Sequence, residues 1–147
     1  MYNRILVATD GSPLSKKAVS AAISLAALTG AELVALTVVP RYPMSYFEGG
    51  MSISPQEVSR VEQAWSDNAR QIVDAVTETA MKKGIKAKAV VTRSDLVAEA
   101  VIAAASKHKS DLIIMASHGR KGLKRVLLGS ETQHVLTHST VPVLVLR

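Results

Sequence analysis

The strongest constraint on the fold is a regular alternation between short apolar runs and longer segments of helical character. Five runs have the length and aliphatic content of strands, and three of them are almost continuously apolar, as strands covered on both faces are. These runs cover residues 3–9, 31–39, 86–92, 110–117 and 141–147. Helices are predicted between them at 13–29, 56–83, 95–107 and 130–138, the first three from apolar residues that recur at helical spacing. The order predicts an α/β fold, a doubly wound parallel sheet of five strands.

Residues that begin and end helices agree with these limits. Ser12 is a candidate N-cap with Pro13 at the first helical position, and Gly30 ends that helix. Gly84 ends the second helix, and Ser130 is the candidate cap of the last one.

The composition is that of a globular protein with an aliphatic core. With 147 residues and 48% hydrophobic content, the chain is most simply one domain over residues 1–147. No apolar run approaches the roughly 18–20 residues that a membrane span needs. The first residues show no export signal, and the lack of cysteine excludes disulfides and thiolate metal sites. We therefore expect a cytoplasmic protein that does not contact membranes.

The net charge of +6 raises the question of nucleic-acid binding. The basic residues are scattered along the chain, and no aromatic residues lie among them to form a base-stacking platform. Solvated helix faces explain most of these charges, and we do not expect nucleic acid as a partner.

Two loops contain the residue types from which a phosphate site can be built. The first, ATDGS, follows the first strand and contains Asp10, whose carboxylate can accept hydrogen bonds from ribose hydroxyls or contact a metal ion. The second, ASHGRKGLKRVLLGS, follows the fourth strand. In it, Gly119 permits close approach of the backbone to phosphate, and Gly129-Ser130 begins a helix whose dipole favours anions. If the first and fourth strands are neighbours where the strand order reverses, the two loops form one site.

Each loop also has an ordinary structural explanation. The first is a normal turn with a helix cap, and Gly129-Ser130 is an adequate helix start without any ligand. The nucleotide hypothesis therefore depends on finding both loops together. A third segment, 40–56, is long and irregular, follows the second strand, and could cover a site at the same end of the sheet.

Other chemical motifs are missing or incomplete. The sequence has no Walker-type phosphate loop, no G-x-G-x-x-G after the first strand and no G-x-S-x-G elbow. His134 and His138 are four residues apart, but the Glu of a zinc-protease motif and a third ligand are lacking. No group is evident that would position water or a nucleophile for phosphoryl transfer.

At these residues the sequence resembles the universal stress protein A family. The resemblance covers essentially the whole chain, through ILVATDGS at the start, SDLIIMASHGRKGLKRVLLGS in the last third and VLTHSTVPVLVLR at the end. It implies a Rossmann-like sheet of order 3-2-1-4-5. The nucleotide-binding branch of the family has the motif G-x2-G-x9-G-[S/T], which Gly119, Gly129 and Ser130 match here. Ala116 stands at the first glycine position, where its methyl group is expected to weaken binding.

The resemblance implies a site for ATP, ADP or AMP. In it, Asp10 meets the ribose and the backbone of Val38 recognises adenine. Met115 and Ala116 line the base and sugar, and Gly119, Gly129 and Ser130 hold the phosphates. The full set of implied nucleotide-binding residues is Ala8, Thr9, Asp10, Val38, Met115, Ala116, His118, Gly119, Arg120, Gly129, Ser130 and Glu131. Asp10 is also the candidate contact to Mg²⁺ bound through the nucleotide.

The functional expectation is a nucleotide-responsive regulatory module of the stress response. Two alternatives remain open: a nucleotide-free interaction protein, favoured by Ala116, and a slow ATPase or phosphotransferase. In the implied order the strand at 141–147 is an apolar edge, and family members commonly pair such edges across a two-fold axis. We therefore expect a homodimer through residues 141–147.

Overall fold

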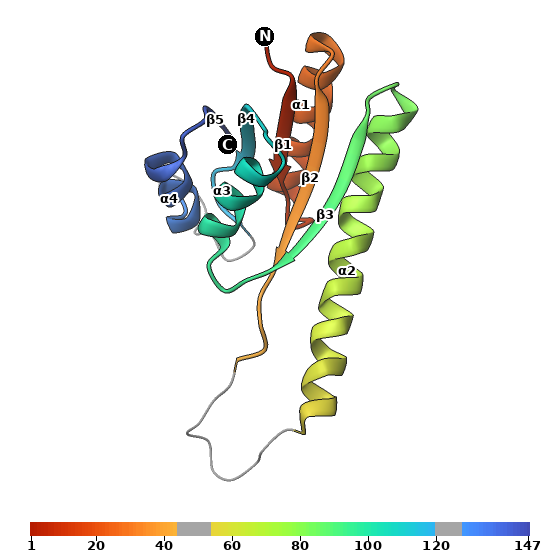
Figure 1. The fold of residues 1–147 in the computed structure, drawn as a ribbon, viewed down its shortest axis with the longest axis vertical. Helices are drawn as coiled ribbons and strands as arrows, with labels where there is room; N and C mark the ends of the chain where they lie inside the picture. Colours follow the sequence, from red (N-terminus) through yellow and green to blue (C-terminus); the bar gives the residue numbers. More distant parts are fainter. Residues whose placement is uncertain (44–53, 120–127) are drawn as a thin grey trace.

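The computed structural model describes residues 1–43, 54–119 and 128–147. They form a five-stranded parallel sheet in the order β3-β2-β1-β4-β5, with two helices on each face (Figure 1). The strands are β1 (Arg4–Ala8), β2 (Glu32–Val39), β3 (Ala87–Arg93), β4 (Leu112–Ala116) and β5 (Val143–Leu146). The helices are α1 (Pro13–Thr29), α2 (Pro55–Lys82), α3 (Val97–Lys107) and α4 (Ser130–His138). The predicted fold class, element order and 3-2-1-4-5 topology are confirmed.

Helix α1 begins and ends at the residues that the sequence indicated. The Ser12 side chain accepts a hydrogen bond from the Ser15 amide, and Pro13 is the first helical residue. Gly30 has a φ of 74° and donates its amide to the carbonyl of Ala26, a conformation that favours glycine. The second predicted stop is also in place, because Gly84 follows α2 with a φ of 77°.

The predicted cap of α4 is wrong by one residue. Gly129 is the N-cap and Ser130 is the first helical residue, with no side-chain hydrogen bond at the cap. The physical reason is a tertiary contact: the amide of Gly129 donates to the carbonyl of Ser117 at 2.7 Å. That bond holds the turn at Gly129, whose carbonyl then accepts the first helical bond, from Gln133 at 3.0 Å.

The core has two layers, one on each face of the sheet. Ile5 and Val7 of β1 face α1 and α2, together with Leu33 of β2. The alternate residues Leu6 and Val34 face α3 and α4. Because strand side chains alternate between faces, a strand buried on both faces has to be apolar at successive positions. All five residues of β4 are buried, whereas the edge strands β3 and β5 are at most half-buried.

Two sequence predictions fall outside the described residues. Arg120 is one, and the greater part of the segment 40–56 is the other. None of the four helices described above is long and apolar enough to cross a membrane.

The two-layer core predicts that replacing leucine with alanine has very different effects on the free energy of unfolding at two positions. Leu33→Ala removes a side chain that is 1% exposed, whereas Leu28→Ala removes one that is 84% exposed on α1. We expect Leu33→Ala to lower the free energy of unfolding by about 2–5 kcal/mol, and Leu28→Ala to change it by less than about 0.5 kcal/mol. Urea unfolding monitored by circular dichroism measures both. Equal losses in the two variants would contradict the assignment of the core.

Candidate functional site

Asp10 lies in a tightly bonded turn between β1 and α1. The amide of Ser12 donates to Oδ1 of Asp10 at 2.9 Å, and Gly11, with a φ of 79°, donates its amide to the Thr9 hydroxyl at 3.2 Å. A φ of this sign is readily adopted by glycine. The turn therefore fixes the direction of the Asp10 carboxylate at the carboxyl end of β1.

Thr9 anchors this turn to the sheet and to α1. Its amide donates to the carbonyl of Leu36 at 2.9 Å, and its carbonyl accepts from the Thr37 hydroxyl at 2.7 Å. Its own hydroxyl lies 2.9 Å from that of Ser15. Thr9 and Thr37 are each 6% exposed, so these bonds satisfy polar groups that water does not reach easily. Thr9 thus acts as structural support in the described structure.

The chain after β4 is bonded just as closely to the start of α4. The amide of Ser117 extends the sheet by donating to Leu146 at 2.8 Å, and the Ser117 carbonyl accepts from Gly129. The hydroxyl of Thr132, 2% exposed, donates to the carbonyl of Ala116 at 3.0 Å. These contacts place the N-terminus of α4 at the carboxyl end of β4.

The two loops meet at Gly119. A Cβ atom built on Gly119 would lie 3.1 Å from Oδ2 of Asp10, closer than most real Cβ contacts. A Cβ atom on Gly129 would lie 3.3 Å from both the Cα atom of His118 and the Ser117 carbonyl oxygen. Two of the motif glycines therefore stand where the backbone passes close to a neighbour. The predicted juxtaposition of Asp10 with the loop after β4 is observed.

The N-terminus of α4 offers fewer amides than the sequence suggested. The amide of Gly129, expected to face a phosphate, is already donated to Ser117. The helical ladder begins with Gln133, so the amides of residues 130–132 lie ahead of it. Those amides, with the positive end of the helix dipole, form the anion-favouring part of the site.

Val38 lies where β2 continues past the end of β1. Within β2, Glu32 and Leu36 bond with the backbone on the β1 side, and Leu33 and Val39 with the backbone on the β3 side. Because backbone direction alternates along a strand, the amide and carbonyl of Val38 face the β1 side. They lie beyond the last β1–β2 bond, the one from Thr9 to Leu36. The backbone groups of Val38 are therefore not used in the bonding between β1 and β2 that the structure describes.

The other predicted residues differ in how accessible they are. Met115 and Ala116 are 7% and 8% exposed, so the protein itself covers most of both residues. The ring nitrogen Nδ1 of His118 lies 3.2 Å from the carbonyl oxygen of Gly119, and that contact shapes the turn. Ala8 is half-buried at the end of β1.

Glu131 already has a partner in the protein. Its Oε2 atom accepts a hydrogen bond from the Ala98 amide at 2.8 Å. The N-cap residue of α3, Leu96, makes no side-chain hydrogen bond to the helix. The Glu131 carboxylate caps α3 instead, although Glu131 lies 33 residues after Ala98 in the sequence. A carboxylate at a helix N-terminus is also favoured by the helix dipole. The structure therefore gives Glu131 a bridging contact between α3 and α4.

Sequence reasoning missed the polar residues that hold this site together. Thr37, Ser117 and Thr132 make the buried bonds at the ends of β1 and β4, yet no motif distinguishes them from other hydroxyl residues.

Metal binding has little support among side chains. In the part of the chain that the structure describes, no three His, Asp or Glu residues form a possible metal site. The rings of His134 and His138 lie 4.2 Å apart between centroids, as a pair on the surface of α4.

Comparison with known proteins places this geometry in a family. A model of the universal stress protein family matches residues 1–147. The universal stress protein YxiE of Bacillus subtilis is 33% identical over 100% of both chains. The structure of UspA from Lactobacillus plantarum has a TM-score of 0.83, with 24% identity, and covers 99% of this chain and 98% of that one.

One solved neighbour was crystallised with a nucleotide. It is a universal stress protein in complex with cAMP, which has a TM-score of 0.65 and 24% identity, covering 98% of this chain and 95% of that one. At this identity the likeness establishes a shared fold. The whole-length match and the relative at 33% identity confirm the resemblance seen in the sequence, and the chain belongs to the universal stress protein family.

Proposed function

We propose that this protein binds ATP or a related adenine nucleotide at the carboxyl ends of β1 and β4, and acts as a nucleotide-responsive regulatory module in the stress response. The observation that carries the proposal is the contact between the two loops, in which Oδ2 of Asp10 lies against the backbone of Gly119. A carboxylate beside an exposed glycine and a helix N-terminus combines a partner for sugar hydroxyls with partners for phosphates. The cAMP complex of a related protein is consistent with this assignment.

Each part of the nucleotide has a proposed partner. The Asp10 carboxylate accepts hydrogen bonds from the ribose hydroxyls, and the amide and carbonyl of Val38 bond the adenine edge. The amides of residues 130–132 at the start of α4, with Gly119, contact the phosphates. Mg²⁺ usually binds through one or two carboxylates together with substrate phosphates, so Asp10 is the proposed protein contact to a nucleotide-bound Mg²⁺.

The methyl group of Ala116 is compatible with this proposal. Lys109 is the only residue other than glycine with a positive φ in residues 1–43, 54–119 and 128–147, so Ala116 has a backbone conformation that alanine adopts without strain. Its 8% exposure leaves little methyl surface for a ligand to meet. Alanine in place of the first motif glycine therefore does not argue for an empty site.

One prediction from the proposed function concerns the Asp10 carboxylate. Asp10→Asn keeps an oxygen to accept from Ser12 but removes the negative charge, and we expect the affinity for ATP to fall about tenfold, at the lower end for a hydrogen bond to a charged group. Asp74→Asn, at an exposed position on α2, is the matched control and should leave affinity unchanged. Isothermal titration calorimetry with millimolar ATP gives both values. A wild-type protein that releases no heat would favour the nucleotide-free alternative instead.

A second prediction concerns Ala116 itself. Because the residue is nearly covered, we expect Ala116→Gly to change ATP affinity by less than about threefold, where tenfold corresponds to 1.4 kcal/mol. Ala89→Gly in β3 controls for the backbone cost of glycine in a strand, roughly 0.5–1 kcal/mol of stability. The same calorimetric titration measures the ATP affinity of the wild type and of both variants. A gain of tenfold or more in Ala116→Gly alone would show that the methyl group obstructs the nucleotide.

We also propose that the protein is a homodimer through residues 141–147. β5 is the last strand of the sheet, and Leu144 on it is 42% exposed. The carbonyls of Pro142 and Leu146 accept bonds from β4, so by alternation the backbone groups of Val143 and Val145 face away from β4. An apolar open edge of this kind is normally paired or protected in natural proteins.

Removing one outward amide tests this pairing. Val145→Pro deletes an edge donor at a position where proline is tolerated, whereas Val145→Ala shortens the same side chain and keeps the donor. Light scattering at tens of micromolar should give a dimer mass for the wild type and Val145→Ala, and a monomer mass for Val145→Pro. A monomeric wild-type protein would contradict the proposal, as would an unchanged dimer of Val145→Pro.

A further inference from the structure

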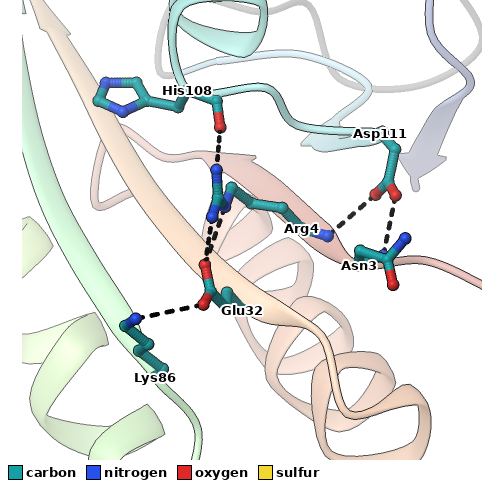
Figure 2. Close-up of polar contacts among 6 residues, drawn as sticks. All are labelled: Asn3, Arg4, Glu32, Lys86, His108 and Asp111. Carbon is teal, nitrogen blue, oxygen red and sulfur yellow. Dashed lines mark hydrogen bonds and ion pairs between the residues drawn. The ribbon is translucent and has the colours of Figure 1, made fainter.

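A row of charged residues crosses the sheet at its amino end, away from Asp10. The strand register sets Arg4 of β1 beside Glu32 of β2, and the pairing of Leu33 with Ala87 sets Lys86 next along the row. Oε2 of Glu32 accepts from Nε and Nη2 of Arg4 at 2.9 and 2.6 Å, and Oε1 lies 3.4 Å from Nζ of Lys86 (Figure 2). The single acid in this row is thus shared between two cations.

The row borders a groove of about 240 Å³ between His108 and the amino end of β3. His108, just after α3, lines one side, Lys86 and Lys88 line the other, and Val34 of β2 contributes to the floor. On β3 the residues Ala87 and Ala89 pack toward α1 and α2, and Val90 packs toward α3. By alternation, Lys86 and Lys88 face the α3 side of the sheet, where both line the groove.

Arg4 connects the groove to α3. Its Nη1 donates to the carbonyl of His108 at 2.7 Å, and the imidazole ring points away from Arg4 (Figure 2). Asp111, the other acid nearby, is directed elsewhere, because its two oxygens accept from the amides of Asn3 and Arg4 at 2.8 and 3.1 Å. Within the residues that the structure describes, the Asp111 carboxylate therefore forms no ion pair with the cations around the groove.

The charges that face His108 leave an excess of positive charge. Glu32 offsets one of its two partners, Arg4 and Lys86, and Lys88 has no ion pair within residues 1–43, 54–119 and 128–147. Burial lowers the pKa of His108, and the nearby charges of Lys88, Lys107 and Arg4 lower it further. An anion bound near these cations would stabilise the protonated imidazole.

We propose that this groove is a second ligand site, which binds a phosphate group carried by a small molecule or present as the free ion. Lys86 and Lys88 supply ammonium donors, and the His108 ring supplies an N–H donor from the opposite wall. Lysine is a common phosphate ligand that acts as a point charge, and the groove has room for more than the phosphate alone. The site lies at the opposite end of the sheet from the proposed nucleotide site, so the two can be occupied independently (Figure 1).

The test follows the ring protons of the histidines by nuclear magnetic resonance in nucleotide-free protein. Inorganic phosphate replaces chloride at constant ionic strength, so that general screening does not change. A bound anion favours the protonated imidazole, and we expect phosphate to raise the pKa of His108 in a saturable way. His134 and His138, exposed or half-exposed on α4, should not respond. Equal shifts in these three histidines, or none in His108, would overturn the proposal.

Lys88→Gln provides the matched variant test. We expect it to weaken phosphate binding about tenfold, at the lower end for a hydrogen bond to a charged group. Lys17→Gln, at an exposed position of α1, should leave phosphate binding unchanged. In Lys88→Gln without phosphate, the pKa of His108 should rise, because one repelling cation is gone. That shift verifies that Lys88 faces the ring even if the affinity effect is small.

A comparison of two phosphate compounds identifies the source of the phosphate. Glycerol phosphate that binds more tightly than inorganic phosphate would assign the groove to a phosphate monoester, and equal affinity would assign it to the free ion. Identical phosphate affinities in Lys88→Gln, Lys17→Gln and the wild type would overturn the site. A failure of ATP to bind at the other end of the sheet would leave this result unaffected.

Discussion

The pairing of β1 with β4 is the constraint on which the rest of the structure depends. The chain leaves β1 toward α1 on one face of the sheet and leaves β4 toward α4 on the other face. Two neighbouring strands whose connections diverge leave a space between them at their carboxyl ends. In this protein Asp10 and Gly119 lie close together at that end of the sheet. The position of the candidate site therefore follows from the strand order more than from any single side chain.

Buried threonines make that arrangement stable. Where a parallel strand ends, its last carbonyl and amide groups lose their ladder partners and have to find others. The carbonyls of Thr9 and Ala116 accept bonds from the hydroxyls of Thr37 and Thr132. Each of these hydroxyls comes from a neighbouring element, so each bond satisfies a buried group and also fixes the position of a loop. These supporting residues thus hold the loops of the candidate site in place.

The fold was predictable because it depends on periodicity, and periodicity is local. The doubly buried strand β4, the cap at Ser12 and the stop at Gly30 could all be predicted from residues a few positions apart. The strand order came from the resemblance to a family, because no local pattern encodes it. The helix start at Gly129 was missed, since it is set by a bond to Ser117 that only the folded chain creates. The contact between Glu131 and Ala98 was out of reach for the same reason.

The two ends of the sheet offer anions different chemistry. At the carboxyl ends the helices begin, so backbone amides and the positive ends of helix dipoles provide the attraction and glycines provide the space. At the amino ends the helices finish, their dipoles present negative charge, and cations such as Lys82 and Lys107 in the last turns are stabilised there.

An anion at the amino end of the sheet has to be bound by side chains, because the helix dipoles oppose it. The lysines of β3 meet this requirement because they belong to a strand and face the side of the sheet opposite α2. The groove near His108 would accordingly bind more weakly and depend more on ionic strength than a site built from amides. That difference suits the two proposed ligands, a nucleotide recognised by shape and a phosphate recognised by charge.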